Sequence, residues 1–161
     1  MDVLEAIRTR RHIKFFKPEP IDEALWMSWL EEAKFAPNHK MTEPWQVLVV
    51  GSETRAQLKH GQNFGDAPLV LAILSKRGQT QLERDENLMA VSCFIQNFSL
   101  LAQSHGAGIR WTSLGWTDAA REVLGVGPDY EVANIIGVGY PREVPEAKSR
   151  EPIANRIKRL P

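Results

Sequence analysis

Apolar positions near the start of the chain follow a helical period. Residues 2–9 carry apolar side chains on one side, which predicts a short helix. A second helix is expected to begin at Asp22, a good N-cap residue, and to be ended by Pro37. Within it, Trp26 and Trp29 are expected to pack in the core. The apolar stripe of this helix consists of Leu25, Trp26, Trp29, Leu30 and Ala33.

Three segments are nearly continuous in apolar and β-branched residues. Trp45–Val50, Leu69–Leu74 and Ala133–Val138 therefore predict strands covered on both faces. A shorter strand is expected over Ile109–Ser113. Short helices are expected over 54–60 and from Thr117 or Asp118 to about Leu124.

The longest predicted element is a helix from about Leu82 to His105, with Gly106 as its C-cap. Apolar residues occupy two of its sides, so the helix is either central in the fold or buried between subunits. The single cysteine, Cys93, lies within this run. We expect a buried, unreactive thiol, no intramolecular disulfide and a reducing, cytoplasmic location.

A chain of 161 residues suits a single domain over residues 1–161, because it contains no linker and no internal repeat. From Pro141 the composition changes to Pro, Lys, Arg and Glu with few apolar residues. We expect residues 141–161 to form an extended C-terminal tail that either is disordered or lies across another surface.

The overall charge argues against several classes of partner. Twenty basic residues balance twenty acidic ones, so no overall field draws the chain to nucleic acid or to an anionic membrane. The N-terminus lacks a basic and apolar leader pattern, and no apolar run approaches the length of a membrane span. No group of His, Cys, Asp and Glu has zinc spacing, so no metal site is expected.

Cations nevertheless gather near both ends of the chain. Two explanations stand: ordinary solvated charge, or a shared anionic ligand such as a compact phosphate, which guanidinium groups chelate. The first group is Arg10, Arg11, His12 and Lys14, and the second is Lys148 and Arg150.

Other catalytic signatures are missing from the sequence, which has no Gly-rich Rossmann turn, no P-loop and no nucleophile elbow. A phosphate-holding cluster without an evident nucleophile or metal indicates that a cofactor performs the reaction. The residues therefore point to a phosphorylated organic cofactor, and no side chain is expected to be an obligatory acid or base.

Four segments, residues 10–15, 36–45, 106–113 and 136–141 with 148–150, resemble, in this order, the motifs of the nitroreductase family of FMN-dependent enzymes. The resemblance spans roughly residues 3–155. The segments are Arg10-Arg11-His12-Ile13-Lys14-Phe15 (the family's Arg-Arg/His-Ser-x-Arg/Lys-x-Phe), residues 36–45 (Ala-Pro-Ser/Asp-x-x-x-x-Gln-Pro-Trp), residues 106–113 (Gly-x-Gly-x-x-Trp), and residues 136–141 with 148–150 (Ile-Gly-Tyr-Pro and a late Lys or Arg).

The resemblance implies an α+β fold, a three-layer sandwich whose mainly antiparallel sheet is flanked by helices. It also implies an intertwined homodimer with FMN at the subunit interface. The first motif and the late cations would bind the flavin phosphate, the second would face the partner's flavin, and the third would touch the ring. The implied cofactor-binding residues are Arg10, Arg11, His12, Lys14, Pro37, Asn38, His39, Met41, Trp111, Thr112, Ser113, Lys148 and Arg150.

Two residues depart from the family's motifs. His12 stands at the usual serine, and its ring N–H can still donate to phosphate. Glu43 stands at the usual glutamine, and a carboxylate near the flavin disfavours negative charge on the reduced ring or an anionic substrate. The stretch between Gly78 and Glu86 lacks the helical excursion of many members, which implies a small lid.

The implied function is an FMN-dependent oxidoreductase that transfers hydride from NADH or NADPH through flavin N5 to a nitroaromatic, quinone or similar acceptor by a ping-pong mechanism. No motif distinguishes NADH from NADPH. One rival is a flavin-binding carrier or sensor without reductase turnover, motivated by Glu43 and the small lid. A second is a nucleic-acid-binding module using Arg8–Lys17, which the balanced charge disfavours.

Overall fold

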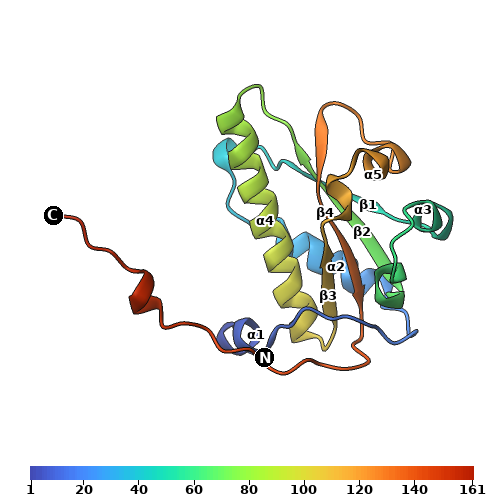
Figure 1. Cartoon of the computed structure of the whole chain (residues 1–161), viewed down its shortest axis with the longest axis horizontal. Coiled ribbons are helices and arrows are strands. Elements are labelled where there is room, and N and C mark those ends of the chain that lie inside the picture. The colour runs from blue at the N-terminus through green and yellow to red at the C-terminus, as the bar shows by residue number, and fades with distance from the viewer.

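A four-stranded sheet forms the centre of the protein (Figure 1). In this computed structural model, which describes residues 1–161, the strands lie in the order β1-β2-β4-β3, and every neighbouring pair is antiparallel. The strands are β1 (Trp45–Val49), β2 (Leu69–Lys76), β3 (Gly108–Thr112) and β4 (Tyr130–Gly139). All the strands expected from the apolar pattern are present, with slightly different bounds.

Helices cover both faces of the sheet (Figure 1). One layer contains α1 (Val3–Thr9), α2 (Glu23–Ala33) and α4 (Gln81–Ser104), and the other contains α3 (Ser52–Gln57) and α5 (Asp118–Val123). Short 3-10 turns lie at η1 (His39–Met41), η2 (Asn63–Asp66), η3 (Leu114–Trp116) and η4 (Ile153–Arg156). The predicted α+β three-layer sandwich is thereby confirmed for the single chain.

Local sequence sets most helix ends. The Asp22 carboxylate accepts a hydrogen bond from the Leu25 amide at 3.1 Å, as an N-cap should. Gly106 follows α4 with φ of +77°, the left-handed conformation that favours glycine. Pro37 was expected to end α2, but the helix ends at Ala33, because residues 34–36 already form a turn.

The sheet has a separate hydrophobic core on each face. On the α2 and α4 side, Trp29 packs edge-on against Phe98, with ring centroids 5.9 Å apart, and Trp26 is also buried. This confirms the packing role expected for both tryptophans. The opposite face is filled around Phe64 and Ile135. Successive strand residues point to opposite faces, so one continuous apolar strand supplies both cores.

Two expectations about burial are wrong for the single chain. β1 was expected to be covered on both faces, but it is the edge strand, and Val49 is 60 % exposed. Cys93 was expected to be buried, but it is only half-buried. It packs partly against the α4-side core and also lines a hollow with Met89 and the loop at Pro37. An apolar pattern indicates that a surface is covered, but it does not indicate whether the same chain or another chain covers it.

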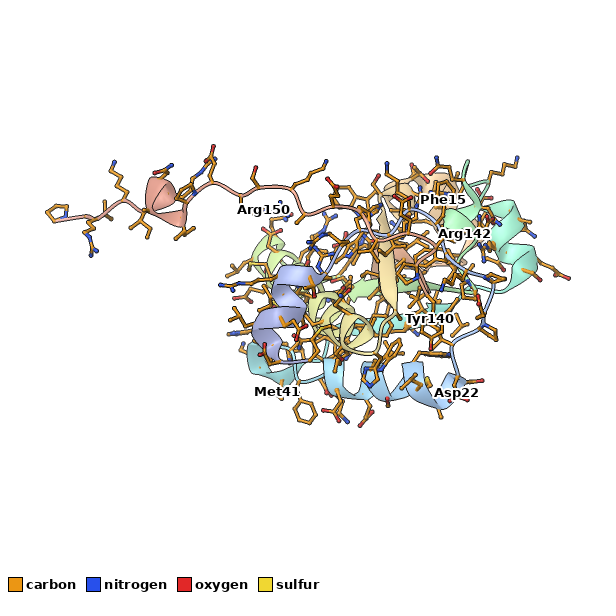
Figure 2. The ribbon with its side chains drawn as sticks, turned by 90° about the horizontal axis from the view of Figure 1, so that it is seen from below. Phe15, Asp22, Met41, Tyr140, Arg142 and Arg150 are labelled. Carbon is orange, nitrogen blue, oxygen red and sulfur yellow. The ribbon has the colours of Figure 1, made fainter.

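The segment after α1 is held along the exposed edge of β3. The Ile13 amide donates to the Ile109 carbonyl at 3.1 Å, and the Phe16 amide donates to the Gly65 carbonyl at 2.9 Å. The C-terminal tail then crosses this segment, because the Arg142 amide donates to the Phe15 carbonyl at 3.1 Å. Figure 2 shows Phe15 and Arg142 side by side.

Past α1 the tail leaves the body of the protein (Figure 1). Figure 1 shows it extending past α1 to a C-terminus far from the sheet. Its regular structure is limited to η4. None of the helices is long and apolar enough to cross a membrane.

We expect Gly65→Ala to lower the free energy of unfolding by at least about 2 kcal/mol. Gly65 has φ of +71°, and an added Cβ would overlap the Lys14 carbonyl oxygen. Gly61→Ala is the matched control, because Gly61 has open space around it and should change stability by less than about 1 kcal/mol. Urea unfolding monitored by circular dichroism measures both, and equal effects would contradict this explanation.

Candidate cofactor-binding site

The two ends of the chain meet in one basic groove. The groove, of about 650 Å³, lies between the segment after α1 and the start of the tail. It brings together all the cations singled out from both ends of the sequence. Its lining consists of Ile7, Arg8, Arg10, Arg11, His12, Lys14, Pro145, Glu146, Ala147, Lys148 and Arg150.

The positive charge of this groove is not compensated within the chain. Six arginines and lysines line it against a single carboxylate, that of Glu146. None of these cations takes part in the four ion pairs of the protein, which are Lys34–Glu31, Arg84–Glu131, Arg142–Asp66 and Arg156–Glu151. Since like charges held together are unfavourable unless an anion joins them, the groove has the electrostatics of an anion site.

The crowding of positive charges in the groove is most evident at Arg10. Burial lowers the pKa of its guanidinium from the ordinary value, and the nearby charges of Arg11 and Arg150 lower that pKa further. Arg11 and Arg150 come from opposite ends of the sequence. Arg150 is itself exposed, but it lies close enough to Arg10 for the two charges to act on one another.

Arg11 offers an unused donor at the groove. Its Nη1 donates to the carbonyls of Arg8 and Arg10, at 2.8 and 3.0 Å, which fixes the guanidinium. Its Nε is buried and has no partner. Buried donors normally have acceptors, so a phosphate oxygen fits this position. Arg8 also lines the groove and was missed in the sequence, although its place three residues before Arg11 would have signalled it.

His12 lies in the same field of charge. Burial lowers the pKa of its imidazole, and the charges of Arg110, Arg10 and Lys14 lower it further, in that order. Arg110 was also missed in the sequence. It lies on β3, beside the parallel bridge between His12 and Ile109.

The three predicted residues at the end of β3 differ in accessibility. Trp111 is half-buried against the α4-side core, and Ser113 is exposed where the chain turns into η3. Thr112 is only 9 % exposed, and its hydroxyl donates to the Ile135 carbonyl at 2.9 Å. The Thr112 hydroxyl therefore donates its hydrogen inside the sheet, and only its oxygen is left to accept from a ligand. The flavin contact of Trp111, Thr112 and Ser113 stays a prediction.

The predicted loop Pro37–Met41 is not part of the basic groove. Pro37, Asn38 and His39 line a different hollow, against Met89 and Cys93 of α4. In Figure 2, Met41 and Arg150 lie on opposite sides of the ribbon. Within one chain the two predicted parts of the site are therefore separate.

The loop is nevertheless held in a defined shape. The Asn38 side chain donates to the Ala36 carbonyl at 3.2 Å and accepts from the Glu43 amide at 2.9 Å. Lys40, Met41 and Glu43 all have positive φ, which non-glycine residues adopt only when the surroundings require it. Such a strained, exposed loop is typical of a segment that contacts a ligand or a partner.

The model of the Nitroreductase family matches this chain over residues 7–60 and 54–140. The chain belongs to the nitroreductase family. The YfhC protein of Bacillus subtilis, provisionally named an NAD(P)H nitroreductase, is 36 % identical over 177 residues, which cover 95 % of this chain and 91 % of YfhC. A Methanothermobacter thermautotrophicus protein, provisionally named an NADH dehydrogenase/NAD(P)H nitroreductase, is 29 % identical over 90 % of this chain and 80 % of its own.

Solved structures agree with the fold of this nitroreductase-family chain. A nitroreductase-like family protein from Bacillus cereus superposes with a TM-score of 0.90 at 26 % identity, covering 99 % of this chain and 96 % of its own. A protein from Exiguobacterium sibiricum, provisionally named a nitroreductase and determined in complex with FMN, has a TM-score of 0.85 at 19 % identity, covering 99 % of this chain and 98 % of its own. The family expected from the four motifs is confirmed, and with it the assignment to oxidoreductases.

Acid should destabilise this protein through His60. Its Nδ1 accepts from the Phe64 amide at 3.0 Å, which requires a neutral ring, and burial followed by the charges of Arg110 and Arg55 lowers its pKa. The unfolded chain then binds more protons below pH about 6.5, so stability should fall as the pH drops from about 7.5 to about 5.5.

His60→Asn should reduce this pH dependence of the melting temperature, measured on cofactor-free protein, and leave the part that comes from the lowered pKa of His12. His39→Asn, at an exposed loop position, is the matched control and should leave the slope unchanged. A wild-type melting temperature that rises on acidification would contradict the assignment of a lowered pKa to His60.

Proposed function

We propose that the protein is an FMN-dependent oxidoreductase that uses NADH or NADPH as electron donor. The observation that carries the proposal is the basic groove, whose uncompensated cations come from both ends of the chain and whose buried Arg11 Nε lacks an acceptor. A dianionic phosphate supplies both the charge and the acceptor oxygens that these groups require.

In this proposal the chain's residues act by binding and orientation. Arg10, Arg11, His12 and Lys14 hold the flavin phosphate from one side, and Lys148 and Arg150 hold it from the other. Bound FMN supplies the redox chemistry, taking hydride at N5 from the nicotinamide and passing electrons to a nitroaromatic, quinone or similar acceptor in a ping-pong cycle.

The flavin ring would extend from the groove along the end of β3. There Trp111 supplies apolar contact, while the exposed Ser113 and the backbone of residues 112–113 supply polar contacts. No side chain acts as an obligatory acid or base. The protein's contribution is to hold the ring, exclude part of the water and stabilise developing negative charge with nearby cations.

We further propose a homodimer in which Pro37, Asn38, His39 and Met41 of one subunit contact the flavin of the other. Separation of this loop from the groove within one chain supports that arrangement. So do the large apolar side chains that the single chain leaves exposed on α1, on α4, after α2 and in the tail. They include Val3, Ile7, Phe35, Met41, Leu82, Met89, Ile153, Ile157 and Leu160.

The single FMN-binding domain would then comprise residues 1–161, with residues 141–161 as a tail that lies on the partner. Of the two alternatives for the tail, disorder or lying across another surface, this proposal takes the second. It likewise places the outer side of α4 at a subunit interface. The lone Cys93 supports a reducing, cytoplasmic location.

A flavin-binding carrier or sensor is the alternative function. Glu43 favours it, because its exposed carboxylate lies in the loop that would face the partner's flavin. The short connection from β2 to α4, residues 77–80, also leaves little material for a lid.

Absorption spectroscopy tests the two functions against one another. The purified protein is expected to carry a yellow flavin chromophore that bleaches on anaerobic addition of NADH or NADPH. A flavin that bleaches with dithionite but with neither nucleotide would support the carrier or sensor. Protein that takes up no flavin when FMN is supplied would overturn both.

Arg10→Ala or Arg11→Ala should weaken FMN affinity about tenfold to hundredfold, because each removes a charge-assisted contact to phosphate. Turnover of the FMN-bound fraction should change much less. Lys34→Ala is the matched control, since Lys34 is a cation paired with Glu31 outside the groove. FMN titration followed by kinetics at saturating FMN separates these effects. Lower turnover with unchanged affinity would contradict the assignment.

Sedimentation velocity tests the homodimer. Ile153 and Ile157 of the tail are 73 % and 60 % exposed in the single chain. Ile153→Asp together with Ile157→Asp should shift the protein toward monomer, because the proposed interface would then bury two charges. Lys158→Asp, on the same tail, should have a smaller effect. A wild-type protein that sediments as a monomer at micromolar concentration would contradict the proposal.

A further inference from the structure

Arg110 links the phosphate-binding segment to a neighbouring loop. From β3, its Nη1 donates to the Lys14 carbonyl at 2.5 Å, and its Nη2 donates to Gln62 Oε1 at 2.5 Å. Gln62 lies directly before η2. One guanidinium thereby joins three parts of the chain that are far apart in sequence.

The Lys14 carbonyl has a distinct position in this segment. On either side of it, the chain is held by hydrogen bonds between backbone groups. The Ile13 amide donates to the Ile109 carbonyl, and the Phe16 amide donates to the Gly65 carbonyl. At Lys14 itself the acceptor is held by the Arg110 side chain. Since Gly65 packs so closely that a Cβ would overlap this carbonyl, the carbonyl has little freedom to find another partner.

Arg110 also adds positive charge close to His12, one of the residues that line the groove. It takes part in no ion pair, and its Nε is buried without a partner. Its charge acts on both His12 and His60. Arg10 and Lys14 also act on His12. The other charged residues that line the groove with His12 are Arg8, Arg11, Glu146, Lys148 and Arg150.

We propose that Arg110 is a positioning residue for cofactor binding, which holds the His12-Ile13-Lys14 backbone in the course that aims these side chains at the phosphate. A planar guanidinium can bridge the two acceptors, whereas an ammonium group cannot reproduce the fork. Arg110 lines no part of the groove itself, so it acts through Lys14 and His12. This inference rests on the proposed function, because the ligand it serves is FMN.

Three variants separate the geometric and electrostatic parts of this role. Arg110→Met removes both, Arg110→Lys keeps the charge but not the fork, and Gln62→Leu keeps the guanidinium but frees one end of it. Arg121→Met is the matched control, because Arg121 also donates to two backbone carbonyls, those of Gly127 and Tyr130, away from the groove. The probe is FMN, titrated into the full-length protein by quenching of its fluorescence.

Arg110→Met should weaken FMN binding about tenfold, and Arg110→Lys and Gln62→Leu by a smaller factor. The pKa of His12, followed by NMR on the FMN-free protein, should rise in Arg110→Met and stay near the wild-type value in Arg110→Lys. Hydrogen exchange of the Ile13 and Phe16 amides should accelerate in Arg110→Met and Gln62→Leu.

Two results would overturn the inference. One is equal weakening of FMN binding in Arg110→Met and Arg121→Met, which would mean general destabilisation. The other is Arg110→Met with wild-type FMN affinity, His12 pKa and amide exchange. If the wild-type protein itself binds no FMN, the proposed function fails. The His12 titration and the amide exchange still test whether Arg110 holds the Lys14 carbonyl in place.

Discussion

The backbone of residues 13–17 is hydrogen-bonded to three other parts of the chain, and the candidate site depends on that arrangement. β3 holds Ile13, the turn at η2 holds Phe16, and the end of β4 holds Lys17. Ile13 and Phe16 are buried, so the side chains between and before them are turned outward. A segment without helix or strand of its own is thus ordered by its neighbours, which allows its cations to be presented in a fixed pattern.

The same anchoring explains how a chain of zero net charge produces a strongly basic site. The tail crosses the segment at Phe15 and Arg142, and this crossing delivers Lys148 and Arg150 to Arg10. Elsewhere, exposed cations such as Arg84 and Arg156 pair with carboxylates and neutralise one another. Charge is therefore balanced over the molecule as a whole and unbalanced in the groove, where an anion would complete the network.

The surfaces that the single chain leaves uncovered lie around the loop Pro37–Met41, the predicted part of the site outside the basic groove. β1 is an open sheet edge, the outer side of α4 exposes Met89, and the strained loop at Lys40 and Met41 stands beside it. Edges and apolar faces of this kind are normally covered in proteins. Their proximity to the loop that the family motif assigns to a partner's flavin connects the proposed dimer with the proposed chemistry.

The sequence by itself determined the strands, the long helix, the cap at Asp22 and the family, because apolar periodicity and short motifs are local properties of the chain. It also identified the arginines and lysines of the groove except Arg8. It misplaced the end of α2 and the burial of β1 and Cys93, and it gave no sign that the Thr112 hydroxyl is engaged within the sheet. Only the tertiary structure decided these points, together with the contacts of Arg110, because they depend on which segments meet when the chain folds. Contacts between residues such as Arg110, Lys14 and Gln62 have no local signature, since the chain must fold before they are neighbours.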